Sequence, residues 1–398
     1  MYKVYQKIIL ACLLLVMTGT VYSQRVTQTI NDGWKFSLFE GDASTADFDI
    51  SGWTDVSIPH TWNAKDADDE IPGYFRGKGW YRKVVTVEEL IPEQRVYLSF
   101  EGANQETNVF VNGTFVGNHK GGYSAFTFDV TDYVHAGRNL IAVSVDNSHH
   151  PDIAPLSADF TFFGGIYRDV YLVYTSPVQL STTHYASSGV YLKASKITDL
   201  QANISVKTFL SNALKSNQSL ILETEILDAD GNRVALSQKK VNVKAEEKNV
   251  AFESLMTITQ PKRWDVDSPY IYKVYSRLKN KKEEVLDCVV NPLGIREYRF
   301  DAEKGFFLNG KYRKLIGTSR HQDYKGMGNA LRDEMHIRDV QLSKDMGSNF
   351  LRVAHYPQDP VVMQMCDKLG LLTSVEIPVV NAITQSKAFM DNCVEQVT

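Results

Sequence analysis

The sequence predicts a multidomain protein in which two antiparallel β-sandwiches precede a set of parallel βα units. Its 398 residues, 43% of them hydrophobic, exceed the roughly 250 to 300 residues that one core usually serves. Short strand-like segments with glycine, asparagine and aspartate turns run to about residue 295. From Leu315 onward, apolar runs alternate with segments of helical period, which indicates a second fold class in the same chain.

Residues 1–23 have the three regions of a secretory signal peptide. Lys3 and Lys7 precede an apolar run from Ile8 to Met17, and small residues follow up to Ser23, after which we expect cleavage. The run is about half of the roughly 20 residues that span a bilayer, which disfavours a membrane anchor. Cys12 lies too early in the run for lipoprotein attachment. The sequence therefore predicts an exported protein, periplasmic or extracellular, with no membrane partner after cleavage.

Charge and cysteine content disfavour a nucleic-acid partner, a cysteine metal site and a disulfide framework. The formal net charge is −4 and no block of Lys and Arg stands out, so a nucleic-acid partner is not predicted. Cys288, Cys366 and Cys393 remain after the signal, and their spacing fits neither a metal site nor a full set of disulfides. We expect them to be small buried residues.

Residues 24–175 are predicted to form the first sandwich. Asn112-Gly113 separates two strand-like runs, and because both residue types accept positive φ this pair predicts a two-residue hairpin. Apolar residues alternate strictly from Asn139 to Asn147, as in a strand.

Residues 176–295 are predicted to form a second, immunoglobulin-like sandwich. The turn Asp228–Asn232 separates two of its strands, and Cys288 has no partner within the domain for an inter-sheet disulfide. The charged segment Lys239–Lys248 reads as a solvated hairpin, so no chemistry is assigned to this domain.

Three βα units are predicted between Leu315 and Pro378. Their helices carry Leu331, Met335, Leu342 and Met346 on one face and, in the second helix, an Asp359 cap and a closing Gly370. Polar residues follow each strand. Because parallel strands end on one rim, these side chains should converge there; they are His321, Asp323, Arg352, His355 and Glu376.

The order of short motifs in this region resembles glycoside hydrolase family 2, and most closely its β-galactosidases. The motifs are Leu308-Asn309-Gly310-Lys311, Arg320-His321-Gln322-Asp323, Asp339, Lys344-Asp345-Met346-Gly347, Leu351-Arg352, His355-Tyr356-Pro357, Cys366-Asp367 and Glu376-Ile377-Pro378. The resemblance extends upstream to about residue 30 and implies a jelly-roll sugar-binding domain over 24–175, the immunoglobulin-like domain over 176–295, and the first three βα units of a (β/α)8 TIM barrel over 296–398.

The family reaction uses a pair of glutamates, one on each side of the glycosidic bond. In the family, the acid/base follows the fourth barrel strand and the nucleophile lies near the seventh, so the resemblance implies that both lie beyond Thr398. We therefore expect this chain to be an N-terminal fragment that is inactive alone, with no catalytic residue of its own.

Four residues match substrate-binding or supporting positions of the family. His321 and His355 match histidines that hydrogen-bond sugar hydroxyls, and two histidines at successive strand ends favour this role over a purely structural one. Arg352 matches the arginine beside the nucleophile, with an ion pair to Glu376 as the alternative. Asp159 matches an aspartate near the galactose 6-hydroxyl and, in some members, a sodium ion; an Asx turn is the alternative. Asp323 and Glu376 are weaker candidates, because the family uses other glutamates.

The resemblance implies a retaining exo-β-galactosidase that acts on terminal β-galactose of oligosaccharides or glycans. It implies no required cofactor and admits a bound Na⁺ or Mg²⁺ near Asp159 and a homo-oligomer. Two alternatives stay open. One is a β-glucuronidase of the same family, disfavoured because Glu376-Ile377-Pro378 stands where such enzymes usually have Cys-Pro-Gly. The other is a non-catalytic carbohydrate-binding protein.

Overall fold

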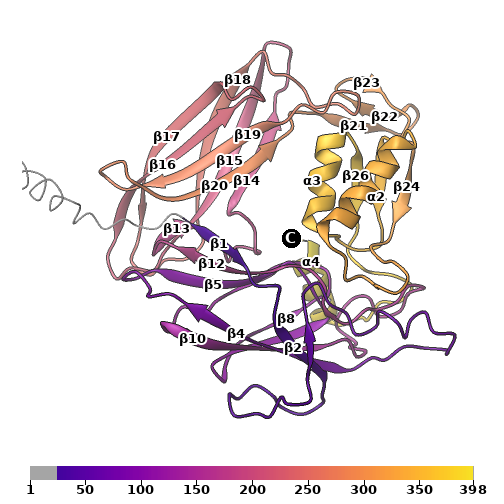
Figure 1. The fold of residues 1–398 in the computed structure, drawn as a ribbon. Helices are drawn as coiled ribbons and strands as arrows, with labels where there is room; N and C mark the ends of the chain where they lie inside the picture. The colour runs from indigo at the N-terminus through magenta and orange to yellow at the C-terminus, as the bar shows by residue number, and fades with distance from the viewer. Residues whose placement is uncertain (1–24, 398) are drawn as a thin grey trace, which may run out of the picture.

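The chain forms two β-sandwiches and a domain of βα units in a computed structural model that describes residues 25–397 (Figure 1). The expected signal peptide lies outside the described residues. The first sandwich lies at the bottom of Figure 1, with the second sandwich at the upper left and the βα units at the upper right. Within the described part of the chain, no helix has the length and apolar character needed to cross a membrane.

Two antiparallel sheets make up the first sandwich. One has the order β1 (Val26–Thr29), β12 (Val170–Thr175), β5 (Arg95–Phe100) and β9 (Phe126–Asp129). The other has the order β3 (Thr54–Val56), β2 (Trp34–Leu38), β4 (Lys78–Val87), β10 (Gly137–Asp146), β7 (Glu106–Val111) and β8 (Thr114–Lys120). A short ladder joins β6 (Ala103–Asn104) to β11 (Gly165–Ile166). The apolar faces of the two large sheets enclose a core that includes Trp34, Leu98 and Ile141.

The predicted hairpin and strand are both present in this sandwich. Asn112 and Gly113 link β7 to β8 with φ of 51° and 81°, the positive values that a two-residue hairpin requires. The alternating segment forms β10, which pairs with β4 and β7.

The second sandwich is immunoglobulin-like, as predicted. In one sheet β13 (Val178–Leu180), β14 (Val190–Ser195) and β18 (Val250–Thr259) all pair with β15 (Gln201–Asn212). The other sheet has the order β17 (Arg233–Val243), β16 (Gln218–Leu227), β19 (Tyr272–Lys279) and β20 (Val285–Leu293). The turn at Asp228–Asn232 joins β16 to β17, as expected.

The prediction of a hairpin at Lys239–Lys248 is wrong, although most of the segment is exposed to solvent as expected. β17 pairs with β16, whereas β18 pairs with β15, so the segment ends one strand and then crosses between the sheets. Charge and alternation are local signals, and they do not record which sheet a strand joins.

The third domain begins with a small antiparallel sheet of β21 (Tyr298–Asp301), β22 (Gly305–Leu308) and β23 (Lys311–Tyr312). Three parallel strands follow, β24 (Gly317–Arg320), β25 (Phe350–Val353) and β26 (Leu372–Val375). Helix α2 (Asp333–Asp345) connects the first two strands, α3 (Pro360–Leu369) connects the second and third, and α4 (Lys387–Val397) comes last. These are the predicted βα units of a TIM barrel.

The helix ends follow the sequence signals, but one helix face does not. The Asp359 carboxylate accepts a hydrogen bond from the Val361 N–H at 2.9 Å, and Gly370 ends α3 with a φ of 75°. In α2, however, Leu342 is 49% exposed, and the buried positions are His336, Val340 and Ser343. The buried face therefore differs from the predicted apolar stripe because Val340 packs toward α3 and β25.

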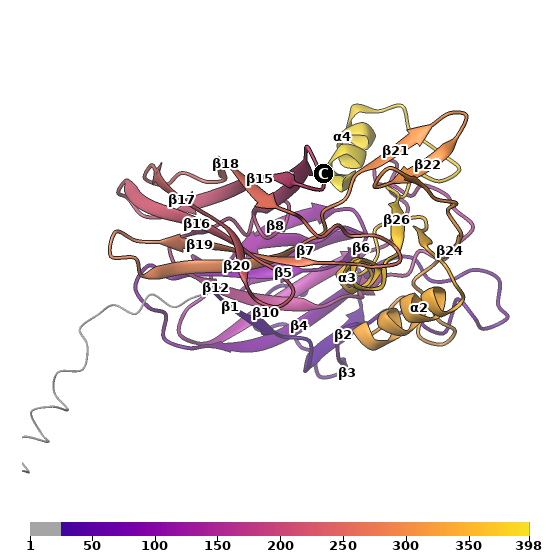
Figure 2. The same cartoon turned by 90° about the horizontal axis from the view of Figure 1, so that it is seen from above.

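Buried contacts join the βα units to both sandwiches. The Trp264 indole is fully buried and donates from Nε1 to the Asp367 carbonyl at 2.7 Å. On the other side, Asn392 of α4 donates to the carbonyl of Lys120 in β8 at 2.8 Å; α4 is the uppermost helix in Figure 2. Cys366 and Cys393 are buried as predicted, whereas Cys288 is half-buried.

Candidate active site

The ends of the three parallel strands bring the predicted rim residues together. His321 follows β24 directly, His355 lies two residues beyond β25, and Glu376 follows β26. The His321 and His355 rings are 5.3 Å apart between centroids. The parallel register, which pairs Ser319 with Arg352 and Arg352 with Ser374, places the strand ends side by side.

Arg352, Glu376 and His355 form one hydrogen-bonded group. The Arg352 guanidinium donates to Glu376 from Nε at 2.5 Å and from Nη2 at 3.1 Å. His355 Nδ1 lies 3.1 Å from Glu376 Oε2. The bond from Arg352 lowers the pKa of Glu376, and the same bond raises the pKa of Arg352. Glu376 is therefore ionised at neutral pH, and the ion pair that competed with a direct role for Arg352 is present.

His321 has a different environment. Its Nδ1 lies 3.2 Å from the Tyr356 hydroxyl, and burial lowers its pKa below the ordinary value of 6.5. The charges of Asp323 and Asp159 oppose this effect, which places both carboxylates near the ring. A neutral imidazole with one nitrogen engaged keeps the other for a ligand.

The two aspartates are less constrained than the histidines. Asp323 and Asp159 are both exposed, and neither side chain forms a hydrogen bond with another residue in the part of the chain that the structure describes. Desolvation by neighbouring atoms nevertheless raises the pKa of the Asp323 carboxyl. Neither an Asx turn nor a fixed partner accounts for Asp159 within the described residues.

Phe160 of the first sandwich completes the rim, although no role was predicted for it from the sequence. Its ring centroid lies 5.4 Å from His321 and 6.0 Å from His355, and it is nearly parallel to the latter, at 19°. The loop that carries Asp159 therefore reaches the strand ends. In the sequence, the aromatic residue next to Asp159 was the signal that could have predicted this contact.

Tyr356 and Arg168 join the first sandwich to the loops at the strand ends, and neither was predicted from the sequence to do so. Tyr356 stacks on Tyr123 of the first sandwich at 4.2 Å and 12°. The buried Arg168 guanidinium donates to Gln322 Oε1 at 2.9 Å and to the Pro357 carbonyl at 2.7 Å, so it contacts both loops that carry the histidines. An arginine in the segment that ends the first sandwich was visible in the sequence, but its partners more than 150 positions away were not.

Carboxyl groups of the first sandwich and of the βα units lie close enough to affect one another: Glu101 and Asp169 in the sandwich, and Asp333 and Asp359 in the βα units. Glu101 has its pKa raised to about 8 by burial and by the charges of Asp359, Asp169 and Asp333. Burial and Asp359 also raise the pKa of Asp333, to about 6. Across residues 25–397, no three His, Cys, Asp or Glu side chains are already arranged around one metal position.

Two curated proteins with different names resemble this chain. A beta-glucuronidase of Bacteroides fragilis is 38% identical over 92% of this chain and 52% of its own length. A beta-galactosidase of Thermoanaerobacter pseudethanolicus is 35% identical over 89% of this chain and 45% of its own. The chain thus spans about half the length of the relatives that it matches.

A solved structure is similar over nearly the whole chain. Bacteroides uniformis beta-glucuronidase 2, covalently bound to cyclophellitol-6-carboxylate aziridine, is 40% identical, with a TM-score of 0.90 over 94% of this chain and 45% of that one. A calcium binding mutant of the same enzyme, with two aspartates replaced, is 39% identical, with a TM-score of 0.86 over the same shares.

Three domain families of one enzyme class match consecutive parts of the chain. Residues 27–177 match the family model described as glycosyl hydrolases family 2, sugar binding domain. Residues 188–296 match the model described as glycosyl hydrolases family 2, and residues 301–396 match that of its TIM barrel domain. The jelly roll, the immunoglobulin-like sandwich and the parallel βα units occur in the same order in the structure. The chain therefore belongs to glycosyl hydrolase family 2.

Proposed function

We propose that these residues form the sugar-binding end of a retaining, exo-acting β-glucuronidase. The observation that carries the proposal is the 40% identity to a β-glucuronidase over 94% of the chain. This reverses the expectation from the sequence, where a galactosidase was favoured because no Cys-Pro-Gly motif follows the third barrel strand. A motif of three residues weighs less than identity spread over three domains.

The rim supplies hydrogen-bonding groups suited to a sugar. His355 Nδ1 lies 3.1 Å from Glu376 Oε2 and 3.2 Å from Arg352 Nη2, so Nε2 is the ring nitrogen left for a sugar hydroxyl. In His321, Nδ1 is engaged with Tyr356, and Nε2 faces no hydrogen-bonding partner in the part of the chain that the structure describes. Phe160 offers an apolar ring beside both histidines. Arg352 holds Glu376 and His355 in place and would act on a neighbouring carboxylate of the complete site.

A β-galactosidase remains the second candidate, for two reasons. One is the 35% identity to a β-galactosidase over 89% of this chain. The other is the exposed Asp159, because a carboxylate close to carbon 6 would repel a glucuronide and tolerate a neutral hydroxymethyl group.

Purified full-length protein, assayed with nitrophenyl β-glucuronide and nitrophenyl β-galactoside, separates these candidates. We expect the larger kcat/KM with the glucuronide. In the Asp159→Asn variant, galactoside turnover should be little changed if the enzyme is a glucuronidase, and it should fall if Asp159 holds the galactose 6-hydroxyl. A larger kcat/KM for the galactoside in the wild type would restore the galactosidase assignment, and sugar binding without turnover of either substrate would favour a non-catalytic role.

We also propose calcium as the cation of this protein, held by Glu101, Asp169, Asp333 and Asp359 and not near Asp159. All the donors are carboxylate oxygens, which suit calcium, and the raised pKa values of Glu101 and Asp333 indicate negative charge that a cation would compensate. The two aspartates replaced in the calcium binding mutant of the relative stand as far apart in its sequence as Asp333 and Asp359 do here. Because the side chains are not already gathered around one point, binding must draw them together.

Calcium titration of the metal-free protein, followed by calorimetry and by the melting temperature, tests this site. We expect a rise in melting temperature with calcium that disappears in Asp333→Asn/Asp359→Asn and persists in Asp159→Asn. A rise in melting temperature that is lost in Asp159→Asn would instead indicate that the cation binds at the rim.

A further inference from the structure

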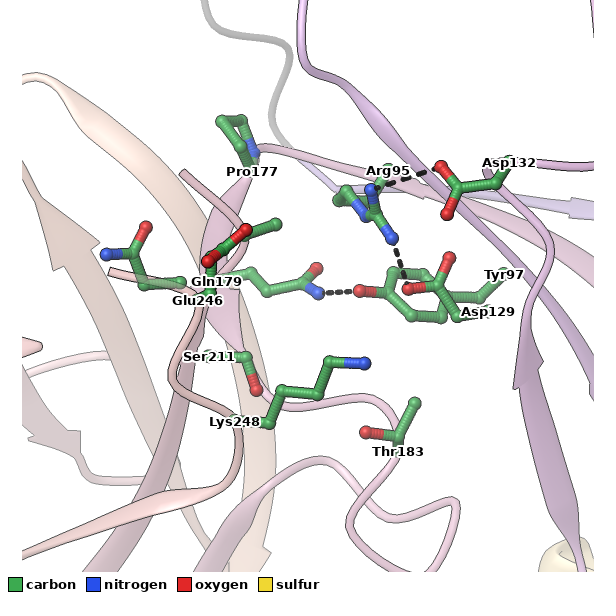
Figure 3. Close-up of a pocket in the computed structure, with 12 residues that line it drawn as sticks. Arg95, Tyr97, Asp129, Asp132, Pro177, Gln179, Thr183, Ser211, Glu246 and Lys248 are labelled. Atoms are coloured by element: carbon green, nitrogen blue, oxygen red, sulfur yellow. Dashed lines mark hydrogen bonds and ion pairs between the residues drawn. The ribbon is translucent and has the colours of Figure 1, made fainter. Parts of the chain in front are cut away.

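A polar cavity lies between the two sandwiches, away from the strand ends (Figure 3). It has a volume of about 230 Å³, several times the roughly 30 Å³ that one water occupies. Strand β5 and the end of β9 supply one wall, and β13 with the crossover between β17 and β18 supplies the other. The polar side chains that line it include Arg95, Tyr97, Asp129, Gln179, Glu246 and Lys248. No lining residue comes from the βα units.

Two side chains that line this cavity each have a buried polar atom whose hydrogen-bonding capacity the described residues do not use. Gln179 is 2% exposed, and its Nε2 donates to the Tyr97 hydroxyl, but its Oε1 has no partner within residues 25–397. The Arg95 Nε is likewise buried without a partner in that range. An unmet buried donor or acceptor destabilises the folded protein, so a ligand that satisfies both atoms is favoured.

The charges around the cavity select against an anion. Arg95 is neutralised by Asp129, with Nη2 to Oδ2 at 2.5 Å, and lies 4.0 Å from Asp132. Lys248 extends from the opposite wall in Figure 3 and has no ion pair within residues 25–397. Together with Glu246, the cavity has three acidic and two basic side chains, a net charge of −1. A neutral ligand is therefore better suited than a uronate or a phosphate.

We propose that this cavity is a second carbohydrate site, which binds a neutral monosaccharide unit or a compact polyol. Vicinal hydroxyls both donate and accept, so they can pair with the Gln179 Oε1 acceptor, the Arg95 Nε donor and the free Lys248 ammonium group. Because the walls belong to different domains, an occupant would also join the first sandwich to the second. The site is independent of the reaction at the strand ends.

Ligand-observed NMR with methyl β-galactoside and with sodium glucuronate tests the proposal. Full-length protein carrying His321→Phe/His355→Phe serves as the background, because these changes weaken sugar binding at the rim. We expect saturable binding of the neutral glycoside in this background, weaker binding of glucuronate, and at least a tenfold rise in Kd when Gln179→Leu is added.

Lys248→Ala provides a second variant, since Lys248 is exposed and its loss should not disturb folding. It should also raise the Kd for the neutral glycoside, and hydrolysis by the otherwise wild-type enzyme should stay unchanged with either substitution. Glycoside binding that is unaffected by both substitutions, no binding in the background, or glucuronate bound as tightly as the glycoside would each overturn the proposal.

Discussion

Replacing Arg168 with methionine is expected to separate the first sandwich from the two loops that carry His321 and His355. Arg168 is 2% exposed and makes four hydrogen bonds. Nη2 donates to Gln322 Oε1 at 2.9 Å and to the Pro357 carbonyl at 2.7 Å across the domain boundary. Nη1 donates to the Tyr123 and Glu101 carbonyls at 3.1 and 3.3 Å within the first sandwich.

The size of the effect follows from these contacts. Hydrogen bonds to a charged group contribute about 1.5 to 3 kcal/mol each, and the two bonds across the boundary would be lost together. Methionine refills part of the volume and removes the cost of burying a charge, which offsets some of the loss. We therefore expect the free energy of unfolding to fall by about 2 to 4 kcal/mol.

Hydrogen exchange measured by mass spectrometry, together with urea unfolding, provides the assay. Peptides over residues 320–323 and 354–358 should exchange faster in Arg168→Met, and kcat/KM should fall because both histidines lose their fixed position. Arg168→Lys should retain part of the protection. Arg138→Met is the matched control, since Arg138 is exposed on β10 and should leave both loops unchanged. Unaltered exchange in both loops of Arg168→Met would refute the reasoning.

Three further predictions concern the rim, the domain contact and pH. His321→Phe and His355→Phe should each lower kcat together with kcat/KM by about tenfold to a thousandfold, about 1.4 to 4 kcal/mol, in steady-state assays; wild-type kinetics in folded variants would indicate a structural role. Gly370→Ala should lower the free energy of unfolding, measured in urea, by about 2 kcal/mol or more, because the new Cβ would lie 2.4 Å from the Val266 carbonyl oxygen at a φ of 75°. Gly347→Ala is the control: Gly347 has a φ of 88° but open space around it, so this change should cost about 1 kcal/mol. Burial lowers the pKa of His119 from 6.5 to about 4, so the unfolded chain takes up this proton first and stability is lost as pH falls from 6.5 to 4. The difference in unfolding free energy between wild type and His119→Gln should therefore change by up to about 3 kcal/mol over that window, and a constant difference would contradict the buried neutral form.

The sequence by itself determined the local structure of this protein. Asn112-Gly113 specifies a hairpin because both residues adopt positive φ, and Asp359 and Gly370 specify the two ends of α3 through their own backbone contacts. The order of strands and helices, and the meeting of His321, His355 and Glu376 at one rim, follow from the same local patterns, because parallel strands must end on the same side of a sheet.

The tertiary structure alone decided how distant segments meet. It assigned β17 and β18 to different sheets, left Leu342 exposed on α2, and brought Phe160 and Arg168 of the first sandwich against the strand ends. The physical reason is that periodicity and capping depend on residues within about one turn or one strand of each other. Docking between domains depends on shape and hydrogen-bonding partners far apart in the chain, as with Arg168 and Gln322, and no local pattern in the sequence records such a pair.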